Sequence, residues 1–327
     1  MKALVNTAAG RLDLLDWPKP IAGAGQVVVR TGACGICATD LEMIAGWTRT
    51  GFPAVPGHEW AGTIVEVGAG DDPSLVGRAC VAENVLADGG EVGFEHPGGY
   101  GQYLLSEARN VQTLPDGFDL RAAALIEPLA VSVRGLRRHH LADPSSALVL
   151  GDGPIGLIMT MLLRRAGVNQ IVLVGGRSAR LALAAELGAS TTIDYHQAGG
   201  LAEAVRRVHP GGFANVIEAT GRIDGAKAGL ELAGKDGHIL ILGDYGPGRA
   251  DFLWNDLLHR ELELVSSNAS AEAWPEAVRL AVSGEINLSR LISHVFPVEK
   301  YAEAFGVVNS RAGNVVKVVL DWEAGQP

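Results

Sequence analysis

Cysteine is scarce in this chain, and the three that it has, Cys34, Cys37 and Cys80, cannot build a disulfide framework. So few thiols are typical of a protein from a reducing compartment, and we therefore expect a cytoplasmic location. Three cysteines also exclude a four-cysteine zinc cluster formed by this chain alone. Any zinc ion would need a mixed set of ligands.

Long apolar runs and basic stripes are also lacking. The most apolar stretch, 154–163, has about ten residues before two arginines, which is too short to cross a bilayer. The first seven residues contain no long apolar segment, so neither a signal peptide nor a membrane partner is predicted. The formal net charge of −10 would repel nucleic-acid phosphates, and nucleic acid is not expected as a partner.

The chain changes character near residue 147, which predicts an α/β protein of two domains. Before that point, short apolar runs alternate with Gly and Pro, as in a β-rich domain, and one helix is expected over 37–45. After it, strands alternate with helices such as 177–187 and 223–233, as in a Rossmann-type doubly wound parallel sheet. The predicted strands are 147–151, 171–174, 191–194, 214–219, 238–243 and 262–266.

The predicted domains are not contiguous in the chain. Residues 1–128 are expected to form the first domain and 129–268 the second. The tail, 269–327, contains two further apolar runs around a helical stretch, and we expect it to return and pair with the N-terminal strands.

A glycine-rich turn follows the apolar run that ends at Leu150. It contains Gly151, Gly153, Pro154, Ile155 and Gly156. Glycine is common here, at 43 of 327 residues, so the pattern alone would also suit a tight structural turn. Its position between a strand and a helix favours a site where backbone N–H groups bind the pyrophosphate of a dinucleotide.

The next strand carries information on the coenzyme's ribose. An acidic residue at its end normally accepts the 2′-hydroxyl of NAD. Here the strand continues into Gly175 and Gly176, followed by Arg177, Ser178 and, two residues later, Arg180. Two guanidinium groups and no carboxylate predict a preference for NADP(H) over NAD(H), unless both arginines are simply solvated residues of the next helix.

Candidate zinc ligands lie in the first domain. Cys37, His58 and Glu127 are residue types that Zn²⁺ accepts, and three protein ligands with one open position form a catalytic rather than a structural site. Cys37 is at an expected helix N-terminus, which favours a thiolate. The spacing alone leaves a structural role open for each residue. A Lewis-acid metal beside a nicotinamide coenzyme would indicate hydride exchange between an alcohol and a carbonyl.

Four segments, taken in order, resemble the zinc-dependent medium-chain dehydrogenase/reductase superfamily. These are Gly35–Asp40, Pro56–Glu59, Glu127–Ala130 and Gly151–Gly156. The pattern is most similar to the polyol branch, which includes sorbitol, threonine and cyclitol dehydrogenases. The resemblance implies a GroES-like catalytic domain, a Rossmann coenzyme domain, a small alcohol or ketone substrate and a homodimer or homotetramer.

The resemblance also implies roles for single residues. Cys37, His58 and Glu127 match zinc-site residues, and Glu59 matches an adjacent acid that is a ligand in some members. Thr39 matches the hydroxyl that relays the proton of the alcohol. Glu42 stands where the family often has a histidine at the outer end of this relay.

Other positions depart from the family or are less specific. The segment Glu83–Gly101 has no cysteine, so the lobe that holds a structural zinc in many members is absent and one catalytic zinc per chain is expected. His96 in this segment is expected to belong to a shortened loop. Asn268, after the last predicted strand, is expected near the nicotinamide.

The sequence therefore predicts a zinc-dependent dehydrogenase that moves hydride between NADP(H) and a secondary alcohol or ketone of polyol, sugar or cyclitol type. Two alternatives remain open. One is a zinc-free, NADPH-dependent quinone or enoyl reductase, and the other is an NADPH-binding protein without turnover.

Overall fold

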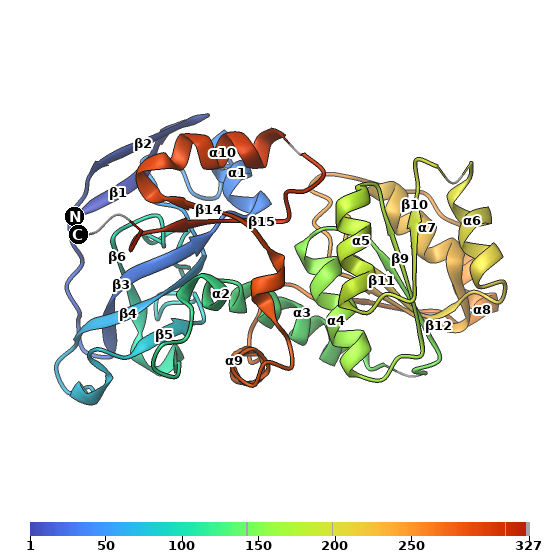
Figure 1. Ribbon diagram of the computed structural model, residues 1–327, viewed down its shortest axis with the longest axis horizontal. Coiled ribbons are helices and arrows are strands. Elements are labelled where there is room, and N and C mark those ends of the chain that lie inside the picture. Colours follow the sequence, from blue (N-terminus) through green and yellow to red (C-terminus); the bar gives the residue numbers. More distant parts are fainter. Residues whose placement is uncertain (142, 198, 311, 325–327) are drawn as a thin grey trace. The chain divides into compact units, whose positions relative to one another are not determined.

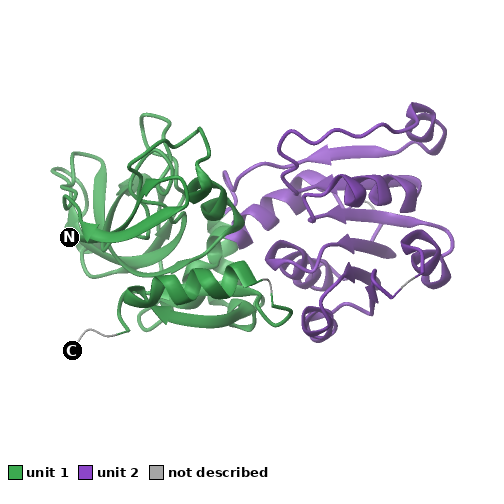
Figure 2. Cartoon of the chain, turned by 90° about the horizontal axis from the view of Figure 1, so that it is seen from above, with its two compact units in different colours: residues 1–127, 274–327 green, residues 128–273 purple. Residues whose placement is uncertain are grey.

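The computed structural model describes residues 1–141, 143–197, 199–310 and 312–324, which form two compact units (Figures 1 and 2). Unit 1 comprises Met1–Glu127 and Trp274–Pro327, and unit 2 comprises Pro128–Ala273. The first border differs from the predicted one by a single residue, whereas 269–273 belong to unit 2 rather than to the returning tail. No helix in the described part of the chain is long and apolar enough to span a membrane.

Unit 2 contains a parallel sheet of six strands. In sheet order they are β10 (Thr191–Asp194), β9 (Gln170–Gly175), β8 (Ser146–Leu150), β11 (Phe213–Glu218), β12 (Ala233–Ile241) and β13 (Glu263–Ser266). Every neighbouring pair is parallel. The order reverses between β8 and β11, and ligands of such sheets bind outside the carboxyl ends of the strands at this reversal. The prediction of a doubly wound sheet is confirmed.

Helices cover this sheet, which explains its near-continuous apolar strands. The helices are α3 (Ile126–His139), α4 (Pro154–Arg165), α5 (Ser178–Leu187), α6 (Leu201–Val208), α7 (Ile223–Leu232) and α8 (Trp254–Arg260). α4 and α5 pack on β8 to β10, whereas α6 packs on α7, which covers β11 and β12 (Figure 1). Leu148, Val172, Val216 and Ile239 are fully buried between these layers.

Unit 1 is built on a mixed sheet of seven strands. Along the sheet they are β14 (Ile292–Pro297), β15 (Lys317–Asp321), β3 (Gln26–Gly35), β4 (Glu59–Val67), β5 (Ala79–Ala82) and β7 (Val111–Thr113), with β6 (Tyr103–Glu107) also paired to β3. β1 (Lys2–Ala8) and β2 (Arg11–Asp16) form a separate antiparallel pair. β15 pairs antiparallel with β3, so the tail returns to the N-terminal strands as predicted.

Short helices complete unit 1. They are α1 (Ala38–Ala45), α2 (Leu120–Ala124), α9 (Trp274–Val282) and α10 (Tyr301–Ser310), with 3-10 turns at Pro73–Leu75, Ala108–Asn110, Leu288–Leu291 and Val298–Lys300. The helix expected over 37–45 begins at Ala38, because Cys37 has extended backbone angles and serves as its N-cap. It ends at Gly46, whose φ of 109° suits glycine.

Candidate functional site

Three of the predicted metal ligands meet in unit 1. Cys37 caps α1, Glu59 is the first residue of β4, and His58 immediately precedes it. One potential ligand atom from each side chain lies within 4.8 Å of those of the other two. His58 and Glu59 are buried and Cys37 is half-buried. We call these three residues the Cys-His-Glu cluster.

Asp40 organises this cluster from inside α1. Its carboxylate, fully buried, accepts hydrogen bonds from the N–H of Cys37 at 2.8 Å, the N–H of Gly57 at 3.3 Å and the hydroxyl of Tyr100 at 3.1 Å. Nδ1 of His58 lies 3.3 Å from Oδ1 of Asp40, close enough for an ion pair but not aligned as a hydrogen bond. A carboxylate behind a ligating imidazole fixes the orientation of the ring.

The charge of Asp40 also changes the titration of the ring. Burial alone lowers the pKa of His58, but the facing carboxylate outweighs burial and raises that pKa well above its ordinary value. Burial raises the pKa of Asp40, and His58 with the N–H and O–H donors brings it below its ordinary value. A metal ion bound by His58 would displace a ring proton, since metal ligands bind in their deprotonated form.

Glu59 is held by a residue that the sequence analysis did not single out. Its Oε1 lies 2.6 Å from Nζ of Lys317 on β15, and Lys317 also donates to the carbonyl of Ile36 at 3.3 Å. Lys317 is only 4% exposed. No motif marks this lysine, because its position depends on the return of β15 to β3.

The other oxygen of Glu59 is available to bind a cation. Oε2 is buried and has no hydrogen-bond partner in the structure, which is costly for a carboxylate oxygen. The same atom lies 2.3 Å from where a Cβ on Gly35 would stand, so only glycine fits there. A thiolate, an imidazole and an unpaired carboxylate oxygen form a donor set that fits zinc.

Glu127 lies near this cluster but not within it. It is the second residue of α3 and is half-buried, and its oxygens are not among the ligand atoms that meet within 4.8 Å. Its pKa is raised to about 7, chiefly by burial; the charge of His58 opposes the shift, and that of Glu59 adds to it. The charges of the cluster therefore affect the pKa of Glu127, although its carboxyl group lies farther away than the three ligand atoms.

The two residues of the expected proton relay share α1. The hydroxyl of Thr39 lies 3.8 Å from Sγ of Cys37, within reach of a weak hydrogen bond to sulfur. Glu42 is exposed three residues later on the same helix. One group therefore lies beside the cluster and the other lies at the surface.

The shortened loop adds an aromatic wall that the sequence analysis missed. The ring of Phe94 lies 5.1 Å from that of His58, and the guanidinium of Arg49 stands 4.3 Å above the ring of Phe94. His96 instead contacts Asp88, with Nε2 at 3.0 Å from its carboxylate. His96 is thus not part of the Cys-His-Glu cluster.

The glycine turn in unit 2 has the shape of a phosphate site. Gly151 has a φ of 118°, and a Cβ on Gly156 would lie 2.0 Å from the carbonyl oxygen of Gly151. Gly153 is the N-cap of α4 without a side-chain cap, and Pro154 and Ile155 form the first turn. The turn therefore presents uncapped helix N–H groups with no side chain in front of them, which fits a pyrophosphate.

The two arginines expected at the ribose contact a residue of this turn. Nη1 of Arg177 lies 2.8 Å from Oδ1 of Asp152, and Nη1 of Arg180 donates to the carbonyl of Asp152 at 3.3 Å. Burial and the neighbouring Arg177 lower the pKa of Arg180 to about 10, although Asp152 opposes the shift. Ser178 is the first residue of α5. The sequence analysis did not single out Asp152, although an acidic residue between Gly151 and Gly153 could have drawn attention to it.

Asn268 follows β13, and its carbonyl accepts a hydrogen bond from Nη1 of Arg134 at 2.6 Å. The same nitrogen lies 3.3 Å from the hydroxyl of Ser267. Arg134 on α3 thus fixes the backbone after the last strand. No described contact links the side chain of Asn268 to the glycine turn.

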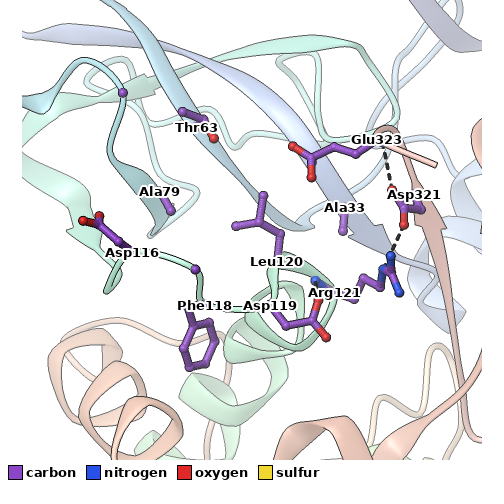
Figure 3. A pocket seen from close by; sticks show the side chains of 13 residues that line it. Ala33, Thr63, Ala79, Asp116, Phe118, Asp119, Leu120, Arg121, Asp321 and Glu323 are labelled. Carbon is purple, nitrogen blue, oxygen red and sulfur yellow. Dashed lines mark hydrogen bonds and ion pairs between the residues drawn. The ribbon is translucent and has the colours of Figure 1, made fainter. Parts of the chain in front are cut away.

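A separate pocket of about 450 Å³ opens in unit 1 (Figure 3). None of the predicted site residues lines it. Its walls carry Asp116, Asp119, Asp321 and Glu323, while Arg121 is already paired with Asp321 at 2.8 Å. Such a lining would repel the phosphates of a nucleotide.

A doubly wound unit with a phosphate-binding turn and a unit with a zinc-type donor set together define a nicotinamide-dependent dehydrogenase. The family models agree, since residues 23–116 match the alcohol dehydrogenase GroES-like domain and residues 154–283 match the zinc-binding dehydrogenase domain. The chain belongs to the zinc-type medium-chain alcohol dehydrogenase family, whose members are NAD(P)-dependent oxidoreductases.

Relatives match along nearly the whole chain. D-altritol 5-dehydrogenase from Agrobacterium fabrum is 30% identical over 93% of this chain and 95% of its own length. D-arabitol-phosphate dehydrogenase from Enterococcus avium is 29% identical over 98% and 97%. A zinc-binding dehydrogenase from Sinorhizobium meliloti, solved bound to NADP, is 27% identical with a TM-score of 0.90 over 98% of both chains.

Proposed function

We propose that this enzyme transfers hydride between NADP(H) and a secondary alcohol or ketone of the polyol, sugar or cyclitol type, with one zinc ion per chain. The observation that carries the proposal is the Cys-His-Glu cluster, whose buried carboxylate oxygen has no partner of its own. The substrate class is supported by relatives named for arabitol phosphate, sorbitol and altritol.

Cys37 and His58 would hold the zinc together with a glutamate. A zinc ion bound there would supply Lewis-acid polarisation of the substrate oxygen. Asp40 would keep the imidazole of His58 in its ligating orientation, and Oγ1 of Thr39 would accept the proton of the substrate hydroxyl while the Thr39 hydroxyl releases its own proton. Glu42, exposed on the same helix, would then pass that proton to solvent.

Two glutamates compete for the third ligand position. The short distances within the cluster favour Glu59, whereas Glu127 lies outside these distances but has a carboxyl group whose pKa is raised to about 7, chiefly by burial. We propose that Glu59 binds in the resting enzyme and that Glu127 contributes to the same site. A second, structural zinc is not proposed, because 83–101 offers no cysteine.

Gly151, Gly153 and Gly156 would bind the pyrophosphate, and Arg177 with Arg180 would favour the 2′-phosphate of NADP(H). A guanidinium pairs with a phosphate through two parallel hydrogen bonds, which is stronger than a neutral contact. The NADP-bound relative is consistent with this preference. Asn268 would approach the nicotinamide.

The test is metal analysis combined with a turnover screen of polyols, sugars and ketones using NADPH and NADH. The wild type should hold one zinc per chain. Cys37→Ser and Glu59→Gln should lose most of it, whereas Glu42→Gln, which removes an exposed carboxylate of the same unit, should retain it. Glu127→Gln should lower turnover more than coenzyme affinity.

Three outcomes would overturn parts of this proposal. Two tightly bound zinc ions per chain would contradict the single site. A metal-free wild type that reduces quinones or enoyl compounds would favour the zinc-free reductase. Coenzyme binding without turnover on any alcohol or ketone would favour a binding protein.

We also propose that two copies associate through unit 2. β13 is the last strand of its sheet, and the adjoining α8 has no buried residue. Large apolar side chains are exposed on these elements and at the N-cap of α8, with Leu253 at 72%, Trp254 at 73%, Leu258 at 68% and Leu264 at 50%. An open strand edge next to such a surface suits pairing with a second copy about a two-fold axis.

A further inference from the structure

Asp152 is a buried carboxylate in the glycine turn, and its side chain contacts residues that follow β9. It is 5% exposed. Oδ2 accepts hydrogen bonds from the N–H groups of Gly176 and Arg177, each at 3.0 Å. Oδ1 lies 2.8 Å from Nη1 of Arg177 and 3.7 Å from Nη1 of Arg180.

The side chain of Asp152 occupies the space that the side chain of an acidic residue at the end of β9 would need. A Cβ built on Gly175, the last residue of β9, would lie 2.5 Å from Cβ and 2.8 Å from Cγ of Asp152. Any side chain at position 175 would collide with Asp152. The lack of an acid at the end of β9 and the presence of Asp152 in the turn are therefore linked. The carboxylate of Asp152 reaches the end of β9 from the turn that follows β8.

The local charge follows from these contacts. Two guanidinium groups carry two positive charges, and Asp152 cancels one of them at hydrogen-bond distance. A coenzyme phosphate must share Arg177 with this carboxylate or displace it. A carboxylate has roughly four acceptor positions, and three donors within 3.0 Å occupy Asp152, which leaves one acceptor position for a ribose hydroxyl.

We propose that Asp152 is a specificity-determining residue for the coenzyme. It supplies from the glycine turn the carboxylate that accepts the ribose hydroxyl of NAD(H), and it acts as counter-ion to Arg177 and Arg180, which limits the preference for a 2′-phosphate. The enzyme then accepts both coenzymes to a degree set by this one charge. The inference rests on the proposed role of Arg177 at the 2′-phosphate.

The test is Asp152→Asn, with dissociation constants for NADPH and NADH measured by fluorescence titration of the protein without substrate. Asparagine keeps an acceptor for the N–H groups but removes the charge. NADPH should bind more tightly and NADH more weakly, and the ratio of the two dissociation constants should move toward NADPH by about tenfold or more, the size of one charge-assisted hydrogen bond. Adenosine 2′,5′-bisphosphate and AMP, used as competitors, should show the same shift.

Two further variants make the outcome specific. Asp224→Asn removes an exposed negative charge from α7 in the same unit and should leave the ratio unchanged. Adding Arg177→Ala to Asp152→Asn should abolish the gain for NADPH. If Asp152→Asn does not fold, as judged by circular dichroism, Asp152→Ser provides the same comparison with a smaller acceptor.

An unchanged ratio in folded Asp152→Asn, or a shift toward NADH, would overturn the inference. A wild type that binds NADH more tightly than NADPH would contradict the proposed coenzyme preference. That result would not contradict the role of Asp152, provided that Asp152→Asn still shifts the ratio of the two dissociation constants toward NADPH. The two failures are therefore distinguishable.

Discussion

At the scale of residues, Lys317 neutralises a buried carboxylate of unit 1. Its ammonium group lies 2.6 Å from Oε1 of Glu59, and both side chains are almost fully buried. Burial alone lowers the pKa of Lys317, but the charge of Glu59 outweighs it and raises that pKa above its ordinary value. The lysine is therefore charged throughout the physiological range and pairs with the carboxylate of Glu59.

Lys317→Met should destabilise the metal-free protein strongly. The substitution leaves the carboxylate of Glu59 buried without its counter-ion, and breaking a buried pair in this way costs about 3–5 kcal/mol. Chemical denaturation after removal of metal by a chelator measures the free energy of unfolding. The double variant Lys317→Met with Glu59→Gln should recover much of the loss, because no unpaired charge remains. A loss below about 1 kcal/mol in the single variant would contradict this account.

At the scale of residues, the sequence identified groups that lie in local motifs and missed those that arrive from elsewhere. Cys37, His58 and Glu59 lie next to turns or caps that their neighbours dictate, and the structure brings them together. Lys317 and Phe94 reach the cluster from β15 and from the shortened loop. Their positions depend on strand pairing and loop packing between distant segments, which no local pattern encodes.

At the scale of elements, α3 ends in a buried histidine that binds the sheet of unit 2. Nε2 of His139 lies 3.0 Å from Oδ1 of Asn215 on β11, and Nδ2 of Asn215 donates to the carbonyl of Ser146 at 3.0 Å. Since Asn215 must present its oxygen, Nε2 carries the proton of a neutral ring. The pKa of His139 is lowered to about 4, chiefly by burial; the hydrogen bond with Asn215 opposes the shift, and the nearby His238 adds to it.

The stability of the protein should therefore fall in mildly acidic solution partly because of His139. The native pKa lies near 4 and the unfolded one near 6.5, so only the unfolded chain gains the proton between these values. The contribution is fully present above pH 6.5 and decreases by up to about 3 kcal/mol as the pH falls to 4. His139→Gln should remove this part of the pH dependence, measured by urea unfolding at several pH values. The exposed His196→Gln is the control, and equal slopes in wild type and His139→Gln would disprove the assignment.

The predicted strands and helices of unit 2 agree with the observed ones within a few residues, because apolar runs and glycine turns mark them locally. The largest difference is β12, which begins at Ala233 rather than at residue 238. α8 was not predicted, since no face of it is buried and its sequence therefore shows no inward apolar stripe. An exposed helix with Trp254 and Leu258 is better explained by an intermolecular contact than by the fold of one chain.

At the scale of the whole molecule, each of the two larger sheets has an edge strand with an exposed apolar side chain. On β13 of unit 2 this is Leu264, at 50% exposure, and on β14 of unit 1 it is Val295, at 38%. The neighbourhoods differ, because only β13 adjoins the exposed apolar residues of α8. Burying one large apolar side chain contributes roughly 1.5–3 kcal/mol, so several together favour association through unit 2.

Leu264→Lys should convert the assembly into monomers, whereas Val295→Lys should not. A lysine on an open strand edge opposes pairing with another strand, both through its charge and through the cost of burying it. Light scattering coupled to size-exclusion chromatography should give twice the mass of one chain, or a larger multiple, for the wild type and for Val295→Lys. Leu264→Lys should give the mass of one chain, with an unchanged circular dichroism spectrum. A monomeric wild type, or dissociation caused by Val295→Lys instead, would exclude the β13 edge as the contact between copies.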